Sequence, residues 1–333
     1  MISRRTLLTS GASACAAGAA VALAPRSAFA QAYPNNTVRL IVPFPPGGAT
    51  DVLGRVVAHD LQELWKQNVI PEYKPGASGL LGTRQVITSP ADGYTLLLAS
   101  TGAILSVAAV AGADAANYQV TRELLPISLV AAPAYILVVH PSVPVNNAAE
   151  VIAYAKKNPG KLTFASSGAG TASHLSGALF GQMAGVEFLH VPYKGTGPAV
   201  NDLLGGHVNM LFSPPQVVAQ HIAAGNLRMI GTTGSERSAL FPDYPTIAAT
   251  GLPNYQSLGW FGLFAPAKTP REIVAKVSAD VGKTLKQPDS IKRLATAGAE
   301  PAPNSPEQFT AFTNKDIAKW LDLAKRANIK LVP

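Results

Sequence analysis

The stretch that most constrains the fold covers residues 38–64, VRLIVPFPPGGATDVLGRVVAHDLQEL. Its apolar start at 38–44 predicts a buried strand, and apolar positions at helical spacing from Val52 onward predict a helix. Prolines and glycines at 45–48 form the turn between them, and Thr50 or Asp51 can cap the helix. The first amides of a helix lack internal partners and lie at its positive end, so the stretch predicts an anion site. The alternative is that these glycines form only a tight turn with no binding role.

Two further strand ends carry the same chemistry. A glycine-rich turn at 74–83 leads into a helix through Val86, and an apolar strand at 94–99 ends at Ser100 and Thr101. The carboxyl ends of parallel strands share one edge of a sheet, where open α/β folds bind their ligands. Because the same pattern occurs at three strand ends, we interpret these turns as parts of one ligand-binding site.

The second half of the chain repeats the pattern after an apolar crossing at 126–140. Hydroxyl- and glycine-rich turns at 166–174 and 192–198 each follow a short strand, and Pro214 follows another at 210–213. A segment at 255–266 returns the chain, and helices with hydroxyl caps at Thr269 and Ser305 finish it. We therefore expect an α/β protein with two domains, 33–133 plus 256–333 and 134–255, that binds a ligand between them.

The first residues, 1–30, are typical of an export signal. Arg4 and Arg5 precede an alanine-rich apolar stretch, and the sequence before position 31 ends in a small-x-small cleavage pattern. We expect cleavage after Ala30 and a periplasmic mature protein. Residues 3–8 are close to a twin-arginine motif, which leaves the choice between the Sec and twin-arginine routes open.

Charge and cysteine content argue against several kinds of site. The only cysteine, Cys15, lies in the signal, so we expect neither a disulfide nor a thiolate metal site in the mature chain. Taking Arg4, Arg5 and Arg26 from the 27 basic residues leaves 24 against 19 acidic residues, a modest excess that suits an acidic ligand. No lysine-arginine run with interleaved aromatics indicates nucleic acid. We expect no metal, no cofactor and no nucleic-acid partner.

An exported enzyme is the rival class. The sequence has no His-Glu-x-x-His, no Gly-x-Ser-x-Gly and no Ser-x-x-Lys motif. Ser78 and Ser167 lie in glycine turns, but the sequence identifies no base for either of them. We therefore expect a binding protein that is not an enzyme, with an exported hydrolase as the alternative.

Six segments carry a family resemblance across nearly the whole mature chain: VRLIVPFPPGGATDVLGR, KPGASGLLGT, DGYTLLLAS, SSGAGTASHLSG, HVPYKGTGPAVNDLLGGHV and GWFGLFAPAKTP. In these segments the chain resembles the substrate-binding receptors of tripartite tricarboxylate transporters, the Bug-type extracytoplasmic solute receptors. The resemblance implies a type II periplasmic binding-protein fold. Each of its two domains is a mixed, mostly parallel sheet flanked by helices, and the ligand cleft lies between them.

The resemblance also implies the binding residues. It implies a carboxylate held mainly by backbone amides of two first-domain loops, at 44–51 and 76–79, with hydroxyls and amides of the second domain closing over it. The implied ligand-binding residues are Phe44, Gly47, Gly48, Ala49, Thr50, Asp51, Gly76, Ala77, Ser78, Gly79, Thr101, Ser166, Ser167, Gly168, Thr171, Tyr193, Lys194, Gly195 and Ser213.

The implied function is that of a monomeric receptor, which captures a small carboxylate by domain closure and delivers it to membrane transporter subunits. A receptor that presents its ligand to a membrane sensor kinase would share all of these residues. That alternative stays open at the level of sequence.

One departure from the family pattern bears on the ligand. Ser213, Pro214 and Pro215 stand where the family is usually polar. If this turn faces the cleft, the pocket is less polar, which favours an aromatic or longer acyl carboxylate over citrate. Lys194 is the one cation expected near the cleft unless it is a solvated turn residue, and His174 is expected to be structural.

Overall fold

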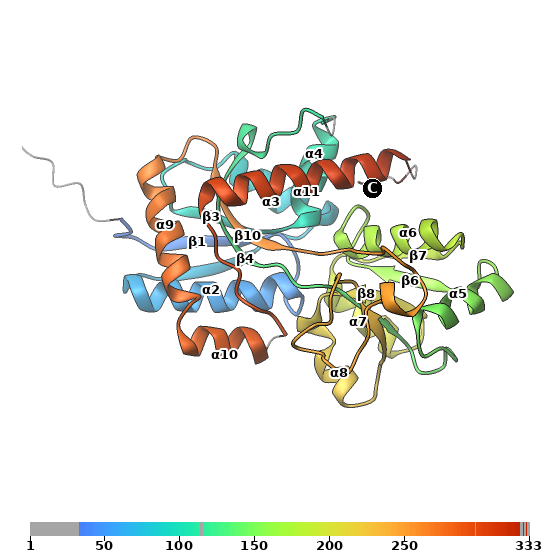
Figure 1. Cartoon of the computed structure of the whole chain (residues 1–333). Helices are drawn as coiled ribbons and strands as arrows, with labels where there is room; N and C mark the ends of the chain where they lie inside the picture. Colours follow the sequence, from blue (N-terminus) through green and yellow to red (C-terminus); the bar gives the residue numbers. More distant parts are fainter. Residues whose placement is uncertain (1–32, 114–115, 297, 327–328, 330, 332–333) are drawn as a thin grey trace, which may run out of the picture. The chain divides into compact units, whose positions relative to one another are not determined.

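The computed structural model describes residues 33–113, 116–296, 298–326, 329 and 331 (Figure 1). The predicted export signal at 1–30 lies outside the described residues. Within the described part, no helix is both long enough and apolar enough to cross a bilayer. Residues 36–333 form one structural unit, and every contact below lies within it.

The first sheet is mixed, and its described strands run in the order β2-β1-β3-β10-β4. The bounds are β1 Val38–Val42, β2 Val69–Tyr73, β3 Thr95–Ser100, β4 Leu124–Ala131 and β10 Phe261–Pro266. β1 pairs in parallel with β2 and β3, so the carboxyl ends of β1 and β3 share one edge as predicted. β2 was not predicted because Pro71 interrupts its pattern. The sheet tolerates this proline because β2 is an edge strand.

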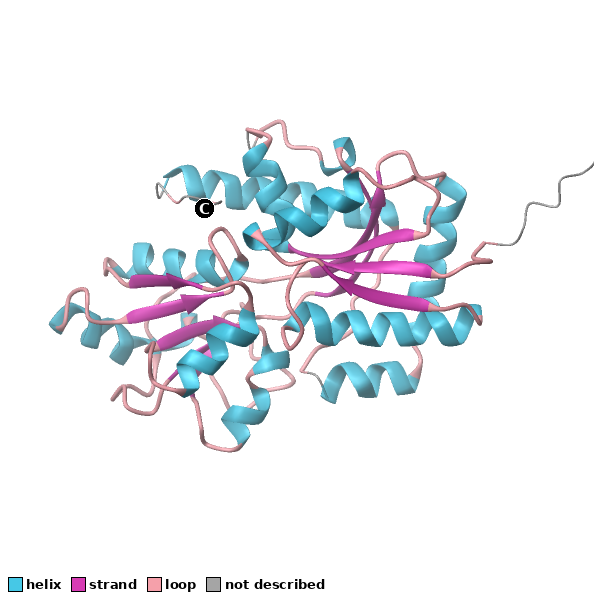
Figure 2. Ribbon diagram, turned by 180° about the vertical axis from the view of Figure 1, so that it is seen from behind, coloured by secondary structure: helices cyan, strands magenta, loops and turns pink. Residues whose placement is uncertain are grey.

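Helices lie on both sides of this sheet, as Figure 2 shows. The bounds are α2 Ala49–Trp65, α3 Leu80–Ile87, α4 Thr101–Val110, α9 Arg271–Thr284, α10 Pro288–Thr296 and α11 Pro306–Arg326, with short 3₁₀ helices η1 Ala77–Gly79 and η2 Val120–Arg122. The sequence predicted α9 and α11 but not the intervening α10.

The two predicted C-terminal helix caps have opposite outcomes. Ser305 Oγ accepts a hydrogen bond from Gln308 N–H, and Ser305 N–H donates to Gln308 Oε1, so the predicted capping box of α11 is confirmed. The hydroxyl cap predicted at Thr269 is wrong. Helix α9 begins at Arg271, and the buried Thr269 hydroxyl has no partner among the described residues.

The second sheet is also mixed, with its described strands in the order β7-β6-β8-β5-β9. The bounds are β5 Ile136–Val139, β6 Thr163–Ser166, β7 Leu189–Pro192, β8 Met210–Ser213 and β9 Arg228–Thr232, with helices α5 Ala148–Lys157, α6 Ala172–Ala184, α7 Thr196–Leu204 and α8 Ala219–Ala223 and the 3₁₀ helices η3 Pro215–Val217 and η4 Ala248–Thr250. β6 is parallel to β7 and β8, whereas β5 is antiparallel to β8 and β9. The turns that follow β6 and β7 therefore share an edge.

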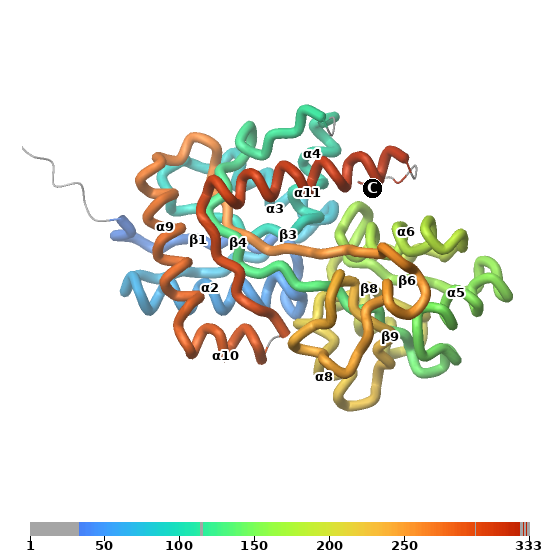
Figure 3. Tube along the Cα trace, in the orientation of Figure 1, coloured from blue at the N-terminus to red at the C-terminus, as the bar shows by residue number. Residues whose placement is uncertain are grey.

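The chain crosses between the sheets at 132–135 and again at 256–260 (Figure 3). The two crossings are hydrogen-bonded to each other: Gly259 N–H donates to Pro133 O, and Ala134 forms an antiparallel bridge with Leu258. We call the part built on the first sheet the first lobe and the part built on the second sheet the second lobe. A paired crossing of this kind is a connection about which two lobes can bend.

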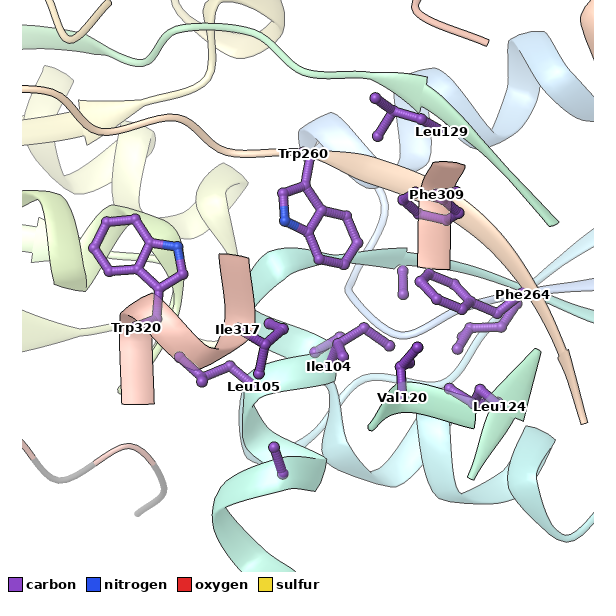
Figure 4. Close-up of a cluster of buried hydrophobic side chains, with 14 of the residues drawn as sticks. Ile104, Leu105, Val120, Leu124, Leu129, Trp260, Phe264, Phe309, Ile317 and Trp320 are labelled. Atoms are coloured by element: carbon purple, nitrogen blue, oxygen red, sulfur yellow. The ribbon is translucent and has the colours of Figure 1, made fainter. Parts of the chain in front are cut away.

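The core of the first lobe combines aliphatic side chains with a cluster of aromatic rings (Figure 4). The ring centroids of Phe264 and Phe309 lie 5.0 Å apart, and Trp260 meets Phe309 edge to face at 5.7 Å. Gly262 on β10 leaves the room that the Phe309 ring occupies, since a Cβ at this position would overlap the ring. This packing fixes α11 on the strand that brings the chain back from the second lobe.

We expect Phe309→Ala to lower the free energy of unfolding by about 3–5 kcal/mol, because the substitution leaves a cavity in a fully buried cluster. Urea unfolding of the purified protein measures this. Ile291→Ala on α10 is the control, since the Ile291 side chain is 42% exposed and its truncation should change stability by less than about 1 kcal/mol. Equal losses in the two variants would contradict this assignment of the core.

Candidate functional site

The turn between β1 and α2 is held by the carboxylate of Asp51. Its Oδ2 accepts a hydrogen bond from Gly47 N–H at 2.8 Å, and its Oδ1 accepts from Arg55 Nε at 2.7 Å and from the Tyr73 hydroxyl at 2.5 Å. Burial works to raise the pKa of Asp51, but the hydrogen bonds from Arg55, Gly47 and Tyr73 outweigh it, so this pKa lies below its ordinary value. The buried carboxylate is therefore charged at neutral pH and shapes the turn.

This arrangement changes the predicted role of Asp51. Neither Thr50 nor Asp51 caps α2, because Gly48 is the N-cap residue and no side-chain cap bond forms. Both Asp51 oxygens are occupied within the first lobe, so the structure places this residue in support of the turn. Gly47 has a φ of 85°, which favours glycine, whereas Gly48 has an ordinary φ of −92°.

The turn before α3 has a backbone that side chains rarely adopt. Gly76, Ala77, Ser78 and Gly79 have φ values of 144°, 46°, 55° and 93°. Ala77 and Ser78 are strained in this region, and such strain is concentrated at functional sites. Ser78 also lies against the second lobe, because a Cβ built on Gly168 would be 2.6 Å from Ser78 Oγ.

The third predicted strand end forms the start of α4, with Ser100 as its N-cap. Thr101 is fully buried, and its hydroxyl accepts a hydrogen bond from Trp260 N–H at 3.1 Å. Thr101 N–H in turn donates to Trp260 O at 3.2 Å. The Thr101 hydroxyl thus joins α4 to the end of the second crossing. Next to it, Gly102 approaches the second lobe so closely that a Cβ there would lie 2.7 Å from Thr171 Cα.

The turn between β6 and α6 is built by its own hydroxyls. Ser166 Oγ lies 3.1 Å from Gly168 O and 2.6 Å from His190 Nε2. Thr171 Oγ1 donates to Gly168 O at 2.7 Å and accepts from His174 N–H at 3.5 Å, so Thr171 caps α6. These predicted ligand groups hold the shape of the second-lobe turn.

Two stacked histidines fix the same turn. The rings of His174 and His190 are parallel within 5°, with centroids 3.9 Å apart. His174 Nδ1 accepts a hydrogen bond from Gly170 N–H at 3.0 Å, which requires that nitrogen to be unprotonated. Burial, with a smaller contribution from His190, lowers the pKa of His174 to about 3, and burial lowers the pKa of His190 to about 4. Both rings are neutral at physiological pH, and His174 is structural.

The turn between β7 and α7 brings the second lobe against the first. Gly195 has a φ of 149°, and a Cβ there would lie 2.9 Å from Pro45 Cδ. The Tyr193 hydroxyl donates its proton to Asp202 Oδ2 at 2.6 Å, so it has no second proton to donate to a ligand. Lys194 is exposed and does not line the cavity described next. The expectation of a cation at the cleft is thus not supported.

A small cavity lies where these turns meet. Its lining residues come from both lobes and from both crossings or their ends: Phe44, Gly48, Ala49, Thr50, Ser100, Tyr135, Ser167, Thr196, Pro214 and Phe261. Its volume of about 20 Å³ leaves room for about one water molecule. Among these described lining residues there is no charged side chain.

The structure brings some of the predicted residues together at this cavity, namely Phe44, Gly48, Ala49, Thr50 and Ser167. The other predicted residues are not among its lining: Gly47, Asp51, Gly76, Ala77, Ser78, Gly79, Thr101, Ser166, Gly168, Thr171, Tyr193, Lys194, Gly195 and Ser213. Ser213, for example, is fully buried and donates to Pro214 O at 3.0 Å. Most of this group builds the turns or the contacts between the lobes.

The prediction omitted Ser100, Tyr135, Thr196, Pro214 and Phe261, all of which line the cavity. Ser100 and Thr196 carried a signal, because Ser100 is a hydroxyl residue at a predicted strand end and Thr196 lies in the predicted turn at 192–198. Tyr135 and Phe261 lie at the ends of the two crossings, where no local pattern indicates a site.

The N-termini of α2, α4 and α7 converge on the cavity. α2 contributes Ala49 and Thr50, α4 contributes its N-cap Ser100, and α7 contributes its first residue, Thr196. The first N–H groups of a helix lack partners within that helix and carry partial positive charge. In α4 the first of them, Thr101 N–H, already donates to Trp260 O, so the N–H groups that follow it are the ones left for a ligand. A cavity of this kind suits an anion without needing a charged side chain.

The histidine pair makes stability depend on pH. The folded-state pKa values of about 3 and about 4 lie below the ordinary value of 6.5, so the unfolded chain binds more protons as the pH falls below about 6.5. We expect the free energy of unfolding to fall by at most about 1.4 kcal/mol per pH unit for each histidine between pH 6.5 and pH 4. Urea unfolding at pH 7, 5.5 and 4.5 measures the slope. His190→Phe should reduce it, and an unchanged slope would contradict this account.

Comparison with known proteins gives the family. Residues 53–329 match the family described as "Tripartite tricarboxylate transporter family receptor". BugT of Bordetella pertussis is 36% identical over 302 residues, which cover 91% of this chain and 92% of BugT.

Solved structures agree with the family. R. palustris Rpa4515 with adipate superposes with a TM-score of 0.83 at 33% identity, covering 89% of this chain and 99% of that chain. MatC from Rhodopseudomonas palustris with bound malate gives 0.80 at 30% identity, covering 87% of this chain and 99% of that one. The predicted fold class, a two-domain periplasmic binding-protein fold, is confirmed. The chain belongs to the tripartite tricarboxylate transporter receptor family, to which the Bug proteins are related, and it is a solute-binding receptor rather than an enzyme.

Proposed function

We propose that this protein captures a small carboxylate in the cavity between its lobes and delivers it to the membrane subunits of a tripartite-type transporter in the periplasm. The observation that carries the proposal is the convergence of three described helix N-termini on a cavity whose lining has no charged side chain. In support, Rpa4515 is known with adipate and MatC with malate, both of them small carboxylates.

The proposed contacts are backbone N–H groups at the starts of α2, α4 and α7, assisted by hydroxyls. Thr50, Ser100, Ser167 and Thr196 line the cavity and supply uncharged donors. A carboxylate that accepts several such hydrogen bonds stays ionised and is held without the desolvation cost of a buried cation. We retain the residues of the two first-lobe turns and of the second-lobe turns as proposed binding or supporting residues.

The proposed mechanism is closure of the lobes over the ligand. The cavity holds only about one water, so a carboxylate enters when the lobes are apart. We propose 33–133 plus 256–333 and 134–255 as the moving domains, with the paired crossings as the hinge. Glycines support this mechanism, because Gly195 against Pro45 and Gly102 against Thr171 allow an approach that a side chain would prevent.

A larger groove elsewhere is a poorer candidate. A hollow of about 620 Å³ lies between α9 and α11, with Arg271 and Glu307 in its lining. These opposite charges lie at the starts of their helices and leave no uncompensated positive centre. The groove also contains no part of the turns that join the lobes.

A thermal-shift screen tests the proposal. The purified protein is screened against mono-, di- and tricarboxylates, including aromatic ones, with amino acids and sugars as controls. A ligand that binds only the folded state raises its stability by about 2.7 kcal/mol at a hundredfold excess over Kd. We expect shifts with one class of carboxylate, and the absence of a shift with every acid would contradict the proposal.

Gly48→Val tests the turn between β1 and α2. The backbone at Gly48 accepts a side chain, and a Cβ there would lie 3.8 Å from Pro45 O and 4.0 Å from Thr196 N. The valine methyl groups would therefore reach into the cavity or against α7. We expect at least tenfold weaker binding of the acid that gives the largest shift, with stability changed by less than about 1 kcal/mol.

Isothermal titration measures the affinity of this variant, and urea unfolding measures its stability. Gly282→Val is the matched control, because a Cβ at Gly282 on α9 would meet nothing within 4 Å. Unchanged affinity in Gly48→Val would exclude this turn from the site.

A further inference from the structure

Tyr135 lies at the end of the first crossing, directly before β5, and it lines the cavity beside Phe44 and Phe261. Its residue surface is only 5% exposed. With Pro214, these rings make up the apolar side of the lining, which we call the wall, and the hydroxyl residues at the helix starts make up much of the rest. The Tyr135 hydroxyl is the only polar side-chain group on the aromatic part of this described lining.

The position of Tyr135 is fixed by both crossings. Its N–H donates to Thr233 Oγ1 at 2.8 Å, and its carbonyl accepts from Thr233 N–H at 2.8 Å. Thr233 Oγ1 also bonds Ser257 O in the second crossing. One edge of the ring and the hydroxyl lie against Gly259, since a Cβ at that position would overlap Tyr135 Cε1 and lie 2.7 Å from its hydroxyl oxygen. The backbone of Tyr135 is thus fixed at the paired crossings, and Gly259 leaves the room that its side chain occupies.

The hydroxyl of Tyr135 differs from those of the buried Tyr255 and the half-buried Tyr73. Tyr255 donates to Ser176 O at 2.8 Å, and Tyr73 donates to Asp51 at 2.5 Å. For Tyr135, no residue of the described ranges accepts a hydrogen bond from the hydroxyl. Burial alone raises its pKa, so the hydroxyl is a neutral donor at physiological pH. A donor without a protein partner, on a side chain that is 5% exposed and lines the cavity, is a group that a ligand or a water can satisfy.

We propose that Tyr135 is a specificity-determining residue whose hydroxyl donates a hydrogen bond to an uncharged oxygen of the ligand, and that the ligand is an aromatic monocarboxylate carrying such an oxygen. This inference rests on the proposed function, which assigns the carboxylate to the helix N-termini. The proposed function covers only the carboxylate, whereas Tyr135 determines the chemistry of the part of the ligand that lies away from it.

The charge and shape of the wall select this ligand class. A second carboxylate at Tyr135 would lose its water among Phe44, Phe261 and Pro214, with no cation in the described lining to compensate. A flat aromatic body instead packs favourably against these rings. A single hydroxyl or carbonyl oxygen on that body satisfies the one neutral donor. The wall therefore disfavours citrate-like acids and admits an aromatic acid with one polar substituent.

The test compares wild type with Tyr135→Phe, which keeps the ring and removes the hydroxyl. Isothermal titration uses benzoate, the three monohydroxybenzoates, adipate and malate as probes. For wild type we expect at least one hydroxybenzoate to bind about three- to tenfold more tightly than benzoate, and adipate and malate to bind more weakly than that hydroxybenzoate. In Tyr135→Phe the preference over benzoate should disappear while benzoate binding is unchanged.

Tyr255→Phe is the matched control. It also removes a buried tyrosine hydroxyl from the second lobe, but Tyr255 does not line the cavity, so the preference for the hydroxybenzoate should remain. A thermal melt of each variant checks that the proteins are folded. If Tyr135→Phe is unstable, the wild-type ranking of the six acids still tests the ligand class.

The outcomes separate this inference from the proposed function. Tighter binding of adipate or malate than of every aromatic acid would overturn the ligand class while leaving a carboxylate receptor in place. An equal loss for benzoate and hydroxybenzoate in Tyr135→Phe would overturn the assigned role, since the hydroxyl would then contact the carboxylate. Binding of none of these acids, together with no shift in the wider carboxylate screen, would overturn the proposed function itself.

Discussion

Holding an anion without a cation depends on bringing helix N-termini from two separate sheets to one point. α2 and α4 start from the first lobe and α7 from the second, so no single element forms the site. The two first-lobe starts are fixed by polar bonds: Asp51 holds the turn before α2, and Thr101 ties α4 to Trp260. These bonds matter more than a general electrostatic attraction, because partial charges at helix ends act only over the first turn.

The second lobe also supports its turn with uncharged side chains. The stacked pair of His174 and His190 braces the turn that ends at Thr171, and both rings are kept neutral by burial. A neutral His174 can accept a hydrogen bond from Gly170 without adding a positive charge to the turn beside the proposed anion site. The glycines at the contact between the lobes allow their backbones to approach closely, as Gly102 does at Thr171 and Gly195 at Pro45. In the proposed closure, this approach would keep bulk water from the cavity and strengthen each hydrogen bond there.

The sequence-based predictions were wrong where tertiary contacts overrode the local preference of a residue type. β2 was missed because Pro71 breaks a strand pattern, yet an edge position leaves its missing N–H without consequence. Thr269 has the residue type of a cap but makes no cap bond, since the helix begins two residues later. Asp51 has the residue type of a ligand group, but its oxygens are taken by Gly47, Arg55 and Tyr73, the last of which comes from the missed strand.

The sequence by itself determined the order of strands, glycine turns and helices, and with it the family, the fold class and the turns that gather at one edge. These follow from hydrophobic periodicity and backbone preferences, which act between near neighbours in the chain. Only the tertiary structure decided which side chains line the cavity. Tyr135 and Phe261 are 126 positions apart and come together because both crossings join the same two sheets. No local sequence pattern predicts that these two residues line the same cavity, because strand pairing across the whole fold brings them together.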